Sequence, residues 1–97
     1  MSRFDDLIDR QLGFFLEDNA ELIEACEAAE RAYDRAGREE AEERYSEYLA
    51  LIEEGGDALA ETRDTYASTL DPDVADEYEE AFDAAVRRRL PRFAVAL

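Results

Sequence analysis

The chain has 97 residues and a formal net charge of −16, with 27 acidic residues against 11 arginines and no histidine. The missing histidine excludes catalytic and metal sites that depend on imidazole, and the single Cys26 excludes an intramolecular disulfide. The negative charge disfavours direct binding to nucleic acid or to an anionic membrane, and a composition rich in Ala with few Gly and Pro predicts one helical domain over residues 1–97.

The first apolar stripe predicts a helix over about residues 3–36. Its members recur at steps of three and four, which places them on one helical face. They are Ile8, Leu12, Phe15, Asn19, Leu22, Cys26, Ala29, Tyr33 and Ala36. Cys26 is therefore expected to be a small core residue. Because the stretch "DNAE" could cap a helix, a break between Glu17 and Asn19 is an open alternative.

A second stripe, from Ala41 to Thr69, predicts another helix over about residues 39–70. The two stripes meet at the short segment "AGR" (Ala36–Arg38). So short a connection predicts an antiparallel helical hairpin with coiled-coil-like packing.

Gly55 and Gly56 lie near the centre of this second helix. Two adjacent glycines cost about 2 kcal/mol in a helix interior, which favours a break at 55–56. The alternative is that the glycines leave space for Phe14 or Phe15 of the first helix. The stripe itself is compatible with both interpretations.

The stretch "LDPDV" marks the start of a third helix. Asp71 is a good N-cap, Pro72 suits the first helical position, and Pro91 ends the helix, so it is predicted over residues 72–90. Residues 91–97 form a tail. The expected fold is all-α: a long antiparallel hairpin plus a third C-terminal helix, with a homodimer as the natural completion of a bundle.

Two acidic segments carry a resemblance to an enzyme family. "EEAEE" and "ETRD" fit the pattern E-E-x-x-E, a gap of seventeen residues, and E-x-x-D. This pattern resembles the magnesium-binding signature of the all-α MazG-like nucleotide pyrophosphohydrolases. The resemblance implies a Mg²⁺ site that grips the phosphates of a nucleoside triphosphate. Its ligands are then Glu39, Glu40, Glu43, Glu61 and Asp64.

The phase of the second stripe favours a different interpretation of the same carboxylates. If Ala41, Tyr48 and Ile52 face the partner helix, both acidic segments point outward on one long helix. Outward carboxylates about six turns apart cannot meet at one octahedral ion. We therefore expect a solvated helix face, with no metal, no cofactor and no catalytic residue.

The segment "RRRLPRFAVAL" combines four arginines with an apolar end. One interpretation is a tail packed across the bundle, with its arginines bonded to the helix end or to nearby carboxylates. The other is an exposed docking peptide or a terminal degradation signal. The candidate interaction residues are Arg87, Arg88, Arg89, Arg92 and Phe93.

These features favour a non-enzymatic interaction or adaptor protein that binds a basic protein partner, forms a homodimer, or does both. A nucleic-acid mimic is one kind of such an interaction protein, because carboxylates at helical spacing can imitate the phosphates of nucleic acid. Another alternative is an exported helical hairpin similar to the WXG100 family in length and form, although "AGR" stands where that family has Trp-x-Gly. The start "MSRFDDLIDRQ" lacks the apolar run of a signal peptide, so a cytoplasmic location is expected.

Overall fold

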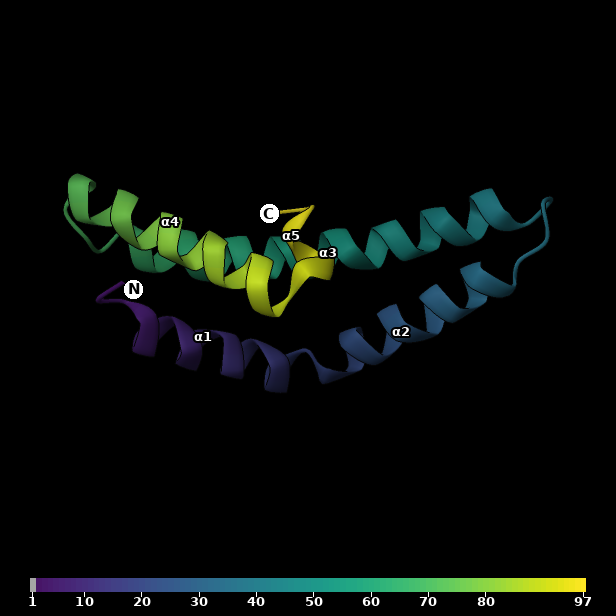
Figure 1. The fold of residues 1–97 in the computed structure, drawn as a ribbon, viewed down its shortest axis with the longest axis horizontal. Helices are drawn as coiled ribbons and strands as arrows, with labels where there is room; N and C mark the ends of the chain where they lie inside the picture. Colours follow the sequence, from purple (N-terminus) through teal and green to yellow (C-terminus); the bar gives the residue numbers. More distant parts are fainter. Residues whose placement is uncertain (1) are drawn as a thin grey trace.

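The computed structural model describes residues 2–97, which form an elongated body with principal extents of 50 × 22 × 21 Å (Figure 1). Every regular element in this range is a helix, so the prediction of an all-α protein is confirmed. Figure 1 shows α1 and α2 following one another along α3, while α4 and α5 cover one half of that assembly. The elements are α1 (Asp5–Asp18), α2 (Ala20–Arg35), α3 (Ala41–Ala67), α4 (Pro72–Arg89) and α5 (Pro91–Ala94).

A break at Asn19 divides the N-terminal stripe, so the single helix expected over residues 3–36 is instead α1 and α2. Asn19 has φ −118° and ψ 27°, which lies outside the helical region. Its backbone N–H and its side-chain amide both donate to the carbonyl oxygen of Phe15, each at 3.0 Å. A short amide side chain competes in this way with regular helical bonding, which favours the end of α1 at this point.

α3 runs without interruption through Gly55 and Gly56, so of the two interpretations of these glycines the break is wrong. The nearest neighbours of the glycines are also not Phe14 or Phe15, the partners that the other interpretation named. Phe14 is 59% exposed, and the space beside Gly55 is occupied by the ring of Phe93. Gly56 faces Ala96 in the same way. The two glycines therefore accept the C-terminal tail, which returns to the middle of α3, rather than a side chain of the first stripe.

α4 closes the core over α1 and α3. Its Tyr78, Phe82 and Val86 recur at steps of four and are fully buried. The ring of Tyr78 lies 4.8 Å from that of Tyr66 in α3 and 5.4 Å from that of Phe4, measured between centroids. The buried core consists of Ile8, Leu12, Phe15, Cys26, Ile52, Leu59, Ala67, Ala75, Tyr78, Phe82, Ala85, Val86 and Phe93.

The cover provided by α4 and α5 ends near the middle of α3 (Figure 1). Beyond it, the end of α2 and the start of α3 form a two-helix arm, which ends in the connection between them. Near the tip of this arm the rings of Tyr33 and Tyr45 lie 5.4 Å apart and remain 39% and 46% exposed. Two helices alone cannot enclose their apolar stripe, which explains this exposure.

Candidate protein-binding groove

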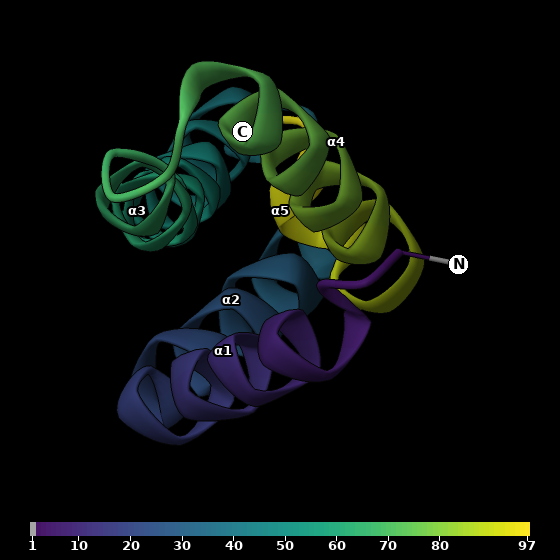
Figure 2. The same cartoon turned by 90° about the vertical axis from the view of Figure 1, so that its left-hand side faces the viewer.

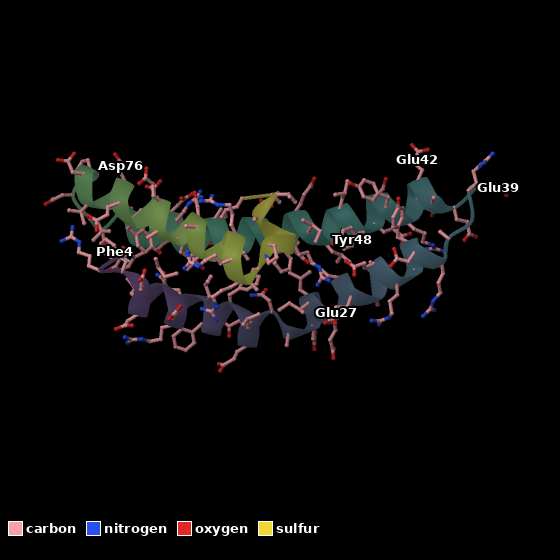
Figure 3. All side chains as sticks on the ribbon, in the orientation of Figure 1. Phe4, Glu27, Glu39, Glu42, Tyr48 and Asp76 are labelled. Carbon is pink, nitrogen blue, oxygen red and sulfur yellow. The ribbon has the colours of Figure 1, made fainter. Side chains whose placement is uncertain are left out.

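The residues of the magnesium signature are spread along α3. Glu39 and Glu40 precede the helix, Glu43 is in its first turn, and Glu61 and Asp64 lie near its other end. Figure 3 shows Glu39 at the tip of the arm. Because α3 is continuous, Glu43 and Glu61 are separated by about 27 Å at 1.5 Å per residue. The structure does not bring these carboxylates to one ion.

Asp64 has another partner. Arg63 lies 2.9 Å from Asp64 and also 2.9 Å from Asp83, so its guanidinium bridges α3 and α4. The hydrogen bond to Asp64 is the main cause that raises the pKa of Arg63, and Asp83 adds to it. Among residues 2–97, no group of three or more acidic or cysteine side chains is arranged to hold a metal ion.

Two of the candidate interaction residues bind carboxylates of their own chain. Arg89 reaches Asp9 of α1 at 3.0 Å, and Arg92 reaches Glu30 of α2 at 3.4 Å. Burial lowers the pKa of Arg92, but Tyr48 and Glu30 raise it by more, and the net shift is upward. These two ion pairs therefore connect the end of α4 to α1 and the short helix α5 to α2.

The tail is packed at Phe93, whereas Val95 near its end is 82% exposed. Phe93 is 2% exposed, and its ring meets that of Phe15 edge to face, with centroids 5.5 Å apart. The alternative of an exposed docking peptide is therefore wrong for Phe93. Arg87 and Arg88 are exposed, and neither forms an ion pair within the part of the chain that the structure describes.

Cys26 is fully buried on α2, as its place in the stripe predicted. Burial raises the pKa of its thiol, and nearby glutamates act in the same direction. The reactive thiolate is therefore disfavoured, and Cys26 serves as a small core residue.

The strongest candidate site lies on the side of the hairpin away from α4. Figure 2 shows α4 on one side of α1 and α3, and no helix of the described chain covers the other side. Two hollows of about 620 and 560 Å³ lie there and share Ala58 in their lining, and we call the two together the acidic groove. Its α3 wall consists of Leu51, Glu54, Ala58, Glu61, Thr62, Thr65, Tyr66 and Thr69. Its other wall consists of Gln11, Glu17, Asp18, Asn19, Ala20, Glu21, Leu22 and Ala25.

Helical spacing explains why these α3 residues share one wall. Leu51, Ala58 and Thr65 are seven residues apart, which is nearly two full turns, so they lie almost in line. Arg63 points to the other side of α3, where it bonds Asp83 of α4. The groove and the α4 interface are therefore two different faces of one helix.

The floor of the groove is apolar and its rim is acidic. Leu22, Ala25, Leu51 and Ala58 are all partly buried there. Around them stand the exposed carboxylates of Glu17, Asp18, Glu21 and Glu54, and Glu61 follows further along α3. No arginine lines the groove. None of its five carboxylates forms an ion pair within residues 2–97.

Tyr78 links this groove to α4 through the core. Its ring is fully buried, and its hydroxyl donates a hydrogen bond to Oε1 of Gln11 at 2.7 Å. Gln11 lines the groove beside Thr62 and Thr65. The hydrogen bond from the buried Tyr78 therefore fixes the position of a side-chain amide in the groove wall. Burial raises the pKa of Tyr78 to about 12, which keeps the hydroxyl protonated as a donor at neutral pH.

The apolar stripes of the sequence did not predict the groove. Its floor contains small residues such as Ala25 and Ala58, which lie beside the main stripes rather than in them. A usable signal was the line of uncharged residues from Leu51 through Ala58 to Thr65, which flanks the second stripe on one side only.

No family model matches the chain, and neither do any of the curated proteins or solved structures with which it was compared. Within residues 2–97, no helix combines the length and the apolar character that crossing a membrane requires.

Proposed function

We propose that the protein is a non-enzymatic interaction module that binds a basic segment of a partner protein in the acidic groove. The observation that carries this proposal is an apolar floor at Leu22 and Leu51 beside carboxylates, such as Glu21 and Glu54, that have no arginine partner in residues 2–97. A cationic partner supplies the missing opposite charges, while contact with the floor supplies apolar burial.

The distribution of arginines supports this proposal. The ion pairs that join distant parts of the chain are Arg3–Glu77, Arg63–Asp83, Arg89–Asp9 and Arg92–Glu30. Each includes a residue of α4 or of α5, which follows it, so the arginines of these four pairs lie on that side and not in the groove. The acidic groove keeps its negative field, which attracts a positive partner and accelerates its association. A nucleic-acid-binding protein is one class of such partners, so mimicry of nucleic acid is a special case of the same proposal.

The experiment starts with capture of partners from native lysate at moderate salt, followed by reconstitution with the purified basic protein that is retained. Two double variants have the same change in net charge. Glu21→Lys with Glu54→Lys alters the groove, while Glu24→Lys with Glu53→Lys alters exposed positions outside it. We expect the groove variant to weaken binding by about tenfold or more and the control to weaken it much less. Equal effects, or no direct binding by any basic protein, contradict the proposal.

The enzyme alternative is tested separately. We expect no Mg²⁺-dependent release of pyrophosphate from nucleoside triphosphates, because the acidic segments lie about 27 Å apart on a continuous helix. Release of pyrophosphate by the purified protein that Glu40→Gln and Asp64→Asn abolish would replace the interaction proposal with the MazG-like one.

The WXG100-like alternative requires the protein to accumulate outside the cell, which immunodetection of culture medium measures.

Homodimerisation is a second candidate property, favoured by the exposed Tyr33 and Tyr45 on the arm. Two copies that pair their arms bury these rings and form a four-helix segment. We expect such a dimer to require salt, because each chain carries a net charge of −16. Sedimentation at low and high salt, with Tyr33→Ser and Tyr45→Ser as the comparison, tests this proposal.

A further inference from the structure

The acidic groove has the length and position of a missing helix. The wall on its α3 side extends from Leu51 to Thr69, two residues past the end of the helix, a distance of roughly 27 Å at the rise of an α-helix. α4 packs against the opposite side of the same α1–α3 pair, as Figure 2 shows. A helix of about 18 residues laid in the groove would therefore complete a four-helix arrangement around α1 and α3.

We propose that the groove takes an amphipathic α-helix of a partner protein, with an apolar stripe flanked on both sides by arginine or lysine. This inference rests on the proposed function and specifies its partner. The two flanks follow from the rim, because Glu17 and Glu21 stand on one wall and Glu54 and Glu61 on the other. A helix whose apolar stripe faces the floor presents its flanking positions to both walls.

The groove also has two chemically different ends. At the end near Leu22 and Leu51, four carboxylates surround an apolar floor. At the other end, threonine hydroxyls replace most of the charge, and Glu61 is the one carboxylate in the wall. The partner helix should therefore have its cations concentrated in one half, with hydroxyl or amide side chains in the other. This asymmetry fixes the direction in which it lies.

Small side chains determine how closely the helix can approach. Ala25 and Ala58 lie in the floor at the acidic end, and neither side chain extends far from its backbone. Large apolar residues of the partner, such as leucine, can fill the space that these alanines leave. A second copy of this chain is disfavoured as the occupant, because two such grooves would bring ten carboxylates together without a cation.

The test uses the full chain and two synthetic peptides of about 18 residues with identical composition, chosen to span the groove. In the first peptide leucines form one stripe flanked by arginines, with the arginines in one half and threonines in the other. In the second the same residues are permuted so that no stripe exists. Fluorescence anisotropy measures binding at low and high salt, and circular dichroism measures the helix gained on mixing. We expect the first peptide to bind at least about tenfold more tightly and to become helical.

Variants of the chain then locate the site. Ala58→Phe fills the floor and should weaken binding by about tenfold, whereas Ala50→Phe on the outer face of α3 should change it by less than about twofold. Glu54→Lys should weaken binding severalfold, and its exposed neighbour Glu53→Lys should not. Circular dichroism of each free variant confirms that the fold is retained.

Equal binding of the two peptides, or equal effects of Ala58→Phe and Ala50→Phe, overturns the helix-in-groove inference while leaving the general binding of basic partners intact. If neither peptide binds up to about 1 mM at low salt, the inference is overturned. If the lysate capture and its reconstitution also yield no basic partner, the proposed function fails as well.

Discussion

The ring of Phe93 lies directly against Gly55, so that a Cβ at residue 55 would collide with the ring. The two residues belong to α5 and to the middle of α3, and the ring of Phe15 in α1 packs edge to face against that of Phe93. Ala96 stands against Gly56 in the same manner. The close approach of tail and helix explains why α3 accepts two glycines in its interior despite their poor helix propensity.

Gly55→Ala should destabilise the protein by about 1–3 kcal/mol, because the added methyl group must displace Phe93 and this strain exceeds the gain in helix propensity. Gly13 is the matched control, since it also lies in a helix but a Cβ added there would meet nothing within 4 Å. Gly13→Ala should stabilise by up to about 1 kcal/mol. Urea denaturation measures the free energy of unfolding of both variants. A gain in stability for Gly55→Ala would show that the ring of Phe93 does not lie against residue 55.

Phe93→Ala should lower the free energy of unfolding by about 3–5 kcal/mol, because a fully enclosed aromatic side chain leaves a cavity between three helices. Val95→Ala, two residues away and 82% exposed, should change it by less than about 0.5 kcal/mol. Thermal unfolding followed by circular dichroism compares the two variants. Similar midpoints would mean that the tail contributes little to the folded state.

Tyr78 should make the protein less stable at alkaline pH. Its pKa in the folded state is raised to about 12 from the ordinary tyrosine value of 10.0, so the folded form holds the proton more tightly than the unfolded form. The free energy of unfolding is therefore unaffected by this group below pH 10.0 and falls as the pH rises towards 12, by about 2–3 kcal/mol in all.

Tyr78→Phe should remove most of this alkaline decrease. At neutral pH the same variant should cost about 0.5–1.5 kcal/mol, since Gln11 loses its hydrogen bond. Tyr33→Phe, at an exposed position, should keep the decrease. Urea denaturation at several pH values provides the measurement, and an alkaline decrease that persists in Tyr78→Phe would assign it to another group.

Salt should stabilise the folded protein. With a net charge of −16 on 97 residues, screening relieves repulsion that is stronger in the compact state, by on the order of 1 kcal/mol or roughly 4–8 °C in Tm. A variant in which Glu17, Glu21, Glu54 and Glu61 are changed to Gln should have a higher Tm at low salt and a smaller dependence on salt. A Tm that falls as salt is added would indicate that the ion pairs between helices outweigh the repulsion.

The sequence by itself determined the helical class and much of the core. Regular steps of three and four predicted that Ile8, Leu12 and Phe15 share one face, and these residues are buried. Asp71 and Pro72 predicted the start of α4. These features depend on neighbours within about two turns of the same helix, where spacing and capping act directly.

Only the tertiary structure decided which distant segments meet. Phe93 reaches Gly55 and Arg63 reaches Asp83, and no local pattern specifies either partner. The acidic groove arises in the same way, because α4 and its arginines occupy one side of the α1–α3 pair and leave the other side open. Which side is covered depends on the summed packing of many side chains, and that sum exists only once the whole chain has folded.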